Sequence, residues 1–210
     1  MSITIRVKYK KGEEVKYVGH LDTMRTFMRC LKRTSIPVSY SKGFNPRIKI
    51  SFALPLGVGV TSESEFFDLE VEERMNIDLF LGELNSTLPD GFRALEANYP
   101  ESNKSLMSLV KEAIYEIMIN DNIELNEIKS LFNRDEILLE KVSKEKKKVD
   151  VIDIKKNILD FSIEDGKCLF HVYAGSINNV NPNTIIEAIN KYVGSIEDFE
   201  INRKELILKD

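Results

Sequence analysis

The spacing of apolar residues changes twice within the first 54 residues, and this change limits how the chain can fold more than any other feature. Apolar and polar residues alternate from Ile3 to Lys10, which predicts a strand with one core face and one basic face. From His20 to Arg33 the apolar residues recur every three or four positions, which predicts a helix that ends before Pro37. Alternation returns from Arg47 to Leu54 and predicts a second strand.

The next segments complete a β-α-β-β-α-β order, which is that of a ferredoxin-like split β-α-β domain. They are a strand at 63–72, a helix at 77–88 and a strand at 92–97. The second half repeats this order with one additional β segment and a basic loop at 143–148. We therefore expect an α+β protein with two ferredoxin-like domains in tandem, at residues 1–98 and 105–210.

Charge is divided unevenly between the two ends of the chain. Residues 1–54 carry 12 Lys and Arg and three acidic residues, a net charge of +9, whereas residues 55–210 carry 18 basic and 31 acidic residues, a net charge of −13. This asymmetry indicates an anionic partner for the N-terminal domain, or attraction between the two domains.

Several classes of protein are not expected. The two cysteines, Cys30 and Cys168, are far apart, and the chain has only two histidines, so we predict no metal site, no cofactor and no cysteine-ligated cluster. No apolar run reaches the 18 residues that a membrane helix needs, and no signal peptide precedes the first strand. We expect a cytoplasmic protein without a membrane partner.

The predicted first helix carries a basic stripe, with Arg25, Arg29, Lys32 and Arg33 at spacings i, i+4, i+7 and i+8. A solvated helix face usually mixes both signs of charge, so this stripe could contact phosphates or an acidic partner. An ordinary solvated face is the alternative. We select Arg25, Arg29 and Arg33 as candidate anion-binding residues.

The connection SYSKGFNPRIKIS, residues 39–51, combines a glycine, an aromatic residue, an Asn-Pro pair and three basic residues. It could form an anion cradle in which backbone N–H groups and cations meet phosphates and Phe44 stacks on a base. It could equally be a turn with Phe44 plugged into the core. The candidate binding residues here are Ser41, Lys42, Gly43, Phe44, Asn45, Arg47 and Lys49.

The polar face of the predicted sheet allows two interpretations. In a split β-α-β fold the first and third strands are neighbours, so Arg6 and Lys8 should face Asp68 and Glu70, with Arg47 and Lys49 on the adjoining edge. This arrangement would form a ladder of cross-strand ion pairs or a platform for a polyanion.

His20 stands at the predicted helix start, two residues before Asp22. Such a histidine commonly packs or caps locally. A general base is the alternative, because neutral imidazole accepts protons near pH 7.

Three stretches carry a family resemblance: VGHLDTMR at 18–25, YSKGFNP at 40–46 and ALPLGVG at 53–59. They resemble the radical SAM-linked protein family, a bacterial family whose members occur beside or fused to a radical SAM protein. The family pattern usually has His-Pro where this chain has Arg47-Ile48. The resemblance implies a radical SAM protein as partner and RNA as a possible ligand.

Two hypotheses follow. The first is a non-catalytic accessory or substrate-binding protein that acts with a radical SAM enzyme and holds RNA or another anionic substrate on its basic N-terminal domain. The second is a metal-independent endoribonuclease similar to the CRISPR repeat-processing nucleases, with His20 as general base and Lys42 or Arg47 stabilising the developing charge.

Overall fold

The structure, a computed structural model, describes residues 3–101, 104–142, 149–175 and 178–209. Within these ranges the chain forms ten β-strands and five α-helices. Contacts divide the chain into two units, the first made of residues 1–110 and 203–210 and the second of residues 111–202. Residues 143–148, predicted to be a basic loop, lie outside the described residues.

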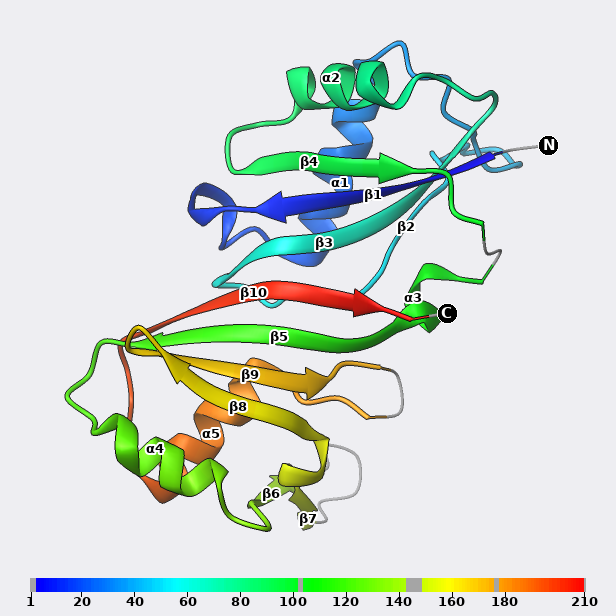
Figure 1. Cartoon of the computed structure of the whole chain (residues 1–210). Helices are drawn as coiled ribbons and strands as arrows, with labels where there is room; N and C mark the ends of the chain where they lie inside the picture. Colours follow the sequence, from blue (N-terminus) through cyan, green and yellow to red (C-terminus); the bar gives the residue numbers. More distant parts are fainter. Residues whose placement is uncertain (1–2, 102–103, 143–148, 176–177, 210) are drawn as a thin grey trace. The chain divides into compact units, whose positions relative to one another are not determined.

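The first unit has the predicted order of strands and helices (Figure 1). Its elements are β1 (Ile3–Lys11), the 3₁₀ turn η1 (Glu13–Val15), α1 (His20–Leu31), β2 (Ile50–Phe52), β3 (Val60–Val71), α2 (Ile77–Thr87), β4 (Phe92–Asn98) and α3 (Leu106–Leu109). Strand β1 lies between β4 and β3, β2 pairs with β3, and each of these pairs is antiparallel.

Strand β2 is shorter than the strand predicted at 47–54. The residues before it pair with the preceding loop instead, because Lys49 N donates to Ser39 O and Tyr40 forms a single bridge with Ile48. The alternating pattern is therefore shared between a loop stem and a strand of three residues.

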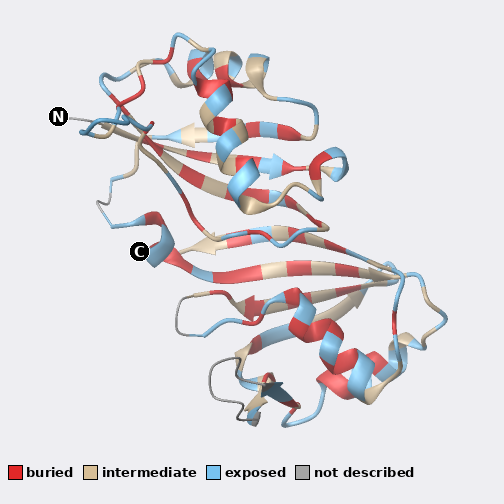
Figure 2. Ribbon diagram, turned by 180° about the vertical axis from the view of Figure 1, so that it is seen from behind, coloured by how far each residue is buried: buried red, intermediate tan, exposed pale blue. Residues whose placement is uncertain are grey.

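Both long helices of the first unit pack on one face of its sheet. Ile5, Val7 and Tyr9 of β1 are buried in the same cluster as Phe27 of α1 and Phe80 of α2. The alternation of buried and partly buried residues along the strands is visible in Figure 2. The polar side chains between these residues therefore lie on the opposite face, away from α1 and α2.

The Phe27 ring fixes how α1 packs on the sheet. It lies 4.8 to 5.8 Å from the rings of Tyr9, Phe52, Phe67 and Phe92, in mostly edge-to-face geometry. Its neighbours on the buried stripe of α1 are Thr23, Cys30 and Leu31. Arg25, Arg29 and Lys32 each follow a residue of this stripe by two positions, which places them about 200° around the helix. The packing of Phe27 therefore turns the basic stripe outward.

The second unit contains β5 (Val110–Ile119, from its second residue), α4 (Leu125–Phe132), β6 (Leu138–Val142), β7 (Val149–Asp153), the 3₁₀ turn η2 (Lys155–Asn157), β8 (Ile158–Glu164), β9 (Lys167–Tyr173) and α5 (Pro182–Tyr192). Strand β9 pairs antiparallel with β5 and with β8, and the rings of Phe132, Phe161 and Phe170 pack together. Strands β6 and β7 pair with each other as a separate two-stranded sheet. The expectation of a single additional β segment is therefore wrong, because the addition is a hairpin of two.

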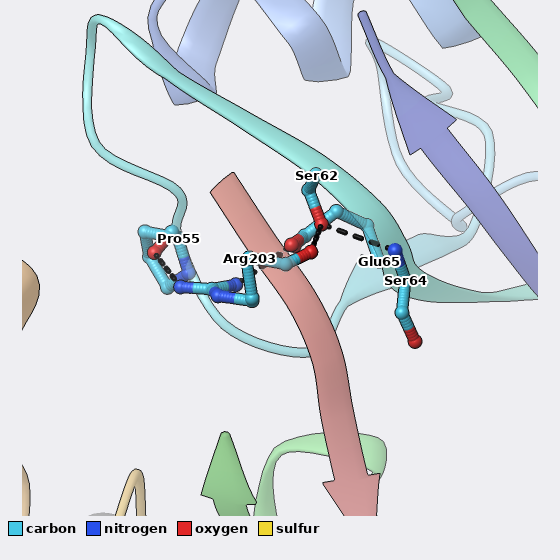
Figure 3. A network of polar contacts seen from close by, with 5 residues as sticks. All are labelled: Pro55, Ser62, Ser64, Glu65 and Arg203. Carbon is cyan, nitrogen blue, oxygen red and sulfur yellow. Dashed lines mark hydrogen bonds and ion pairs between the residues drawn. The ribbon is translucent and has the colours of Figure 1, made fainter. Parts of the chain in front are cut away.

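Strand β10 (Phe199–Leu208) starts in the second unit and continues from Arg203 in the first unit. Arg203 Nη1 lies 2.8 and 3.0 Å from the two carboxylate oxygens of Glu65 on β3. Ser62 Oγ donates to Arg203 O at 3.1 Å (Figure 3). The Arg203 and Glu65 side chains are only 3% and 2% exposed, so this is a buried ion pair of the first unit.

Candidate anion-binding site

The basic stripe of α1 and the segment after the Gly43 loop meet at a pocket of about 370 Å³, which we call the basic pocket. Its lining residues are Arg25, Met28, Arg29, Lys32, Pro46, Arg47 and Ile48. Four of these seven residues are cations and none is acidic. Two segments separated in the sequence therefore bring positive charge to one concave surface.

The loop is held by hydrogen bonds at its base. Ser41 N donates to Arg47 O at 2.8 Å, and Arg47 N donates to Ser41 Oγ at 3.0 Å. Ile48 follows directly and is buried, 4% exposed, in the core of the first unit. The backbone of Arg47 is therefore fixed on both sides, while its side chain lines the pocket.

Little of the pocket's positive charge is neutralised by the protein. Arg25 Nη1 lies 2.8 Å from Asp22 Oδ1 in an exposed pair on the same helix. Within the part of the chain that the structure describes, Arg29, Lys32 and Arg47 form no ion pair. A concave surface with several such cations attracts anions and raises their local concentration.

A larger pocket, of about 530 Å³, lies on the face of the same sheet opposite α1 and α2, and both acidic residues of its lining are paired with cations. Lys49 Nζ lies 2.8 Å from Glu70, and Asp68 accepts two hydrogen bonds from Arg6 at 2.8 and 2.9 Å. These are ion pairs of the predicted ladder. Lys8 takes no part in it, since its register partner on β3 is Phe66. The two carboxylates in its lining make this pocket a weaker anion site than the basic pocket, whose lining has none.

The other predicted binding residues do not line the basic pocket. Arg33 donates to Thr87 O at 2.6 Å and to Cys30 Sγ at 3.3 Å, so it ties the end of α1 to the end of α2. Helix α1 ends at Leu31, and the predicted helical spacing does not extend as far as Arg33. The remaining predicted loop residues, Lys42, Gly43, Phe44 and Asn45, form the exposed tip.

His20 begins α1 and packs its ring edge-on against Phe52, with ring centroids 5.8 Å apart. Burial lowers the pKa of its imidazole. His20 is not among the residues that line the basic pocket.

The sequence prediction of the site left out Lys32, Met28, Pro46 and Ile48. Lys32 could have been selected, because it continues the stripe of Arg25 and Arg29 and keeps helical backbone angles at the helix C-cap. The apolar lining carried no such signal, since Met28 and Ile48 read as ordinary core positions.

Neither a metal cluster nor a membrane-spanning helix is found among the described residues. They hold no group of three or more His, Cys, Asp and Glu side chains that could bind a metal ion. None of their helices is long and apolar enough to cross a membrane.

Comparisons with known proteins give one informative match. No curated protein matches the chain. A solved structure, described as an unknown protein from Galdieria sulphuraria, is 12% identical over 97% of this chain and 99% of its own, with a TM-score of 0.29. Residues 4–182 match a family described as "Uncharacterized protein conserved in bacteria (DUF2344)", and this span contains every residue of the basic pocket. The chain belongs to this bacterial family.

Proposed function

We propose that this chain is a non-catalytic RNA-binding protein that acts beside a radical SAM enzyme and holds its ligand at the basic pocket. The observation that carries the RNA proposal is the meeting of Arg25, Arg29 and Lys32 of the α1 stripe with Arg47 of the loop, without an acidic residue in the lining. The guanidinium group of one arginine can donate two parallel hydrogen bonds to a phosphate, and a lysine adds a compact positive charge.

The apolar residues of the pocket support this role. Met28 and Ile48 line the pocket together with the cations, and apolar surface of this kind can hold the methylene stems of long basic side chains. Such packing limits the motion of these side chains and lowers the entropy cost of binding. A ligand held in this way would be recognised mainly by its backbone charge.

Binding is favoured over cleavage by the position of His20. A neutral imidazole would suit a general base, and burial keeps the pKa of His20 low. Of the two cations proposed to stabilise developing charge, however, Arg47 lines the basic pocket and Lys42 lies at the exposed loop tip, whereas His20 packs against Phe52. We therefore expect no cleavage of RNA by the purified protein in EDTA.

The test is a double charge reversal, Arg25→Glu with Arg29→Glu. We expect RNA binding to weaken by at least about tenfold and its salt dependence to become shallower, by about one unit of slope for each phosphate that is no longer bound. The matched control is Lys10→Glu with Arg93→Glu. These two exposed residues are cross-strand neighbours on β1 and β4, and their reversal changes the net charge equally.

Fluorescence anisotropy over a salt series measures both variants. Equal loss of binding in the control would mean that only overall charge matters, and unchanged binding in Arg25→Glu with Arg29→Glu would overturn the proposal. Cleavage of RNA that disappears in His20→Ala would favour the nuclease instead.

The partner part of the proposal is supported by the resemblance to radical SAM-linked proteins. Co-purification with the radical SAM protein after nuclease treatment tests it, because an association that depends on RNA does not survive this treatment.

We also infer that each unit is a ferredoxin-like split β-α-β domain. The strand order β4-β1-β3-β2 with α1 and α2 supports this for the first unit, and β5-β9-β8 with α4 and α5 supports it for the second.

A further inference from the structure

Phe44 is an aromatic residue that the fold leaves fully exposed at the tip of the loop beside the basic pocket. The possibility that it plugs the core is therefore wrong. We infer that the pocket and Phe44 together bind unpaired nucleotides, so that the ligand is single-stranded RNA with a base stacked on the Phe44 ring. This inference rests on the proposed function and narrows its substrate class.

The loop geometry holds Phe44 away from the protein. Gly43, directly before it, has a φ of +130°, a conformation that side-chain-bearing residues rarely adopt. A Cβ built on Gly43 would meet no atom within 4 Å, so the tip stands in open space. At the base of the loop, Ser41 N and Arg47 N donate hydrogen bonds that close the turn. The ring is therefore presented by a loop with a fixed stem.

Phe44 is close to the basic pocket along the chain. Phe44 is two residues before Pro46, which lines the pocket, so at most about 7 Å of extended chain separates them. A phosphate bound by Arg47 would leave the attached base within reach of the Phe44 ring. Exposed aromatic residues beside cations are the usual elements of sites for single-stranded nucleic acid.

A duplex would not use this arrangement. Its bases stack on each other, and the deep major groove of A-form RNA is closed to side chains. Unpaired bases expose their faces, and stacking on an aromatic ring tolerates any base. The exposed ring therefore selects single strands over duplexes.

The experiment uses the fact that the chain contains no tryptophan. Phe44→Trp introduces a single indole, and we expect a single-stranded oligouridine RNA to quench its fluorescence while the same RNA in a duplex does not. Tyr17→Trp is the matched control, because Tyr17 is also exposed, has a lysine beside its ring and does not line the pocket. We expect no quenching there. Phe44→Ala should weaken single-strand binding by between about 5-fold and 100-fold and leave duplex binding unchanged.

The outcomes separate this inference from the proposed function. Salt-dependent RNA binding that is abolished in Arg25→Glu with Arg29→Glu but unaffected by Phe44→Ala would support the proposed function and overturn the inference. Tighter binding to duplex than to single strands would also overturn it. If neither RNA form binds at low salt, both fail, and binding to an acidic protein surface would replace them.

Discussion

Replacing Arg203 by methionine tests whether the buried ion pair holds the first unit together. The change removes a guanidinium that contacts Glu65 at 2.8 and 3.0 Å, with both side chains at most 3% exposed. Breaking one side of a buried pair typically costs about 3–5 kcal/mol, because the remaining charge stays buried and loses its main partner. Total stabilities are about 5–15 kcal/mol, so this is a large fraction.

The next residue on the same strand provides a matched control. Lys204 Nζ lies 2.8 Å from Glu63, also on β3, but these side chains are 38% and 53% exposed. Solvent screens such a pair, so Lys204→Met should cost at most about 1 kcal/mol. The two variants remove the same sign of charge from adjacent positions and differ mainly in burial.

The pH dependence of the loss gives a second measure. Burial raises the pKa of Glu65, while Arg203, and more weakly the Ser62 hydroxyl and Lys11, act in the opposite direction. Without Arg203 the pKa of Glu65 should rise further above its ordinary value of about 4.3. A carboxyl group whose pKa is higher in the folded than in the unfolded protein costs no stability at pH values below its unfolded pKa. The loss of stability develops as the pH rises through its folded pKa. The deficit of Arg203→Met should therefore be larger at about pH 8 than at about pH 5.

Urea denaturation at both pH values, followed by circular dichroism and by intrinsic tyrosine fluorescence, measures these differences. The double variant Glu65→Leu with Arg203→Met should recover most of the loss, because apolar replacements of a buried pair are often neutral or stabilising. A loss in Arg203→Met no larger than in Lys204→Met, or an equal loss at both pH values, would refute the reasoning.

Two other perturbations follow from local geometry. Gly91 has a φ of +89°, and an added Cβ would lie 2.8 Å from Val15 Cγ2, so Gly91→Ala should lower the stability by more than about 1 kcal/mol. The matched change Gly82→Ala lies within α2, where an added Cβ meets nothing within 4 Å, and should raise the stability by about 0.5–1 kcal/mol. Thermal unfolding of both variants checks this, and a stabilised Gly91→Ala would contradict it. Burial lowers the pKa of His20 in the folded protein. As the pH falls below about 6.5, the imidazole is therefore protonated first in the unfolded chain, which favours unfolding. Acidification should thus destabilise the His20→Gln variant less than the native protein. Equal pH slopes for the two proteins would show that His20 does not contribute.

The parts of the site that were predictable depend on local periodicity. The outward stripe of Arg25 and Arg29 follows from the helical spacing of the apolar residues beneath it, and Phe27 fixes that orientation. The ion pair between Arg6 and Asp68 follows from the neighbouring positions of the first and third strands in a split β-α-β order. In both cases a short repeating pattern determines which way the side chains point.

The parts that were missed depend on where regular structure ends. Arg33 falls outside the stripe because α1 ends two residues earlier. The stretch before Ile50 alternates like a strand, yet its hydrogen bonds go partly to the loop that precedes it. The pairing of β6 with β7 as a separate two-stranded sheet was not predicted either, since a five-residue segment does not encode its partner.

The excess of positive charge in residues 1–54 points to the correct unit but does not by itself locate a site. Six of these 12 cations have structural contacts: Arg6 and Lys49 pair with acids of β3, Lys16 pairs with Glu13, Arg25 with Asp22, Lys11 donates to two backbone carbonyls, and Arg33 ties α1 to α2. Apart from Arg25, whose exposed side chain also lines the basic pocket, these cations are neutralised or held away from that pocket. Arg29, Lys32 and Arg47 have no such ion pair within the described ranges and line the same pocket. A binding site is thus indicated by several cations that line one pocket and have no acidic partner. Which cations are left without such a partner depends on the ion pairs that form across the sheet.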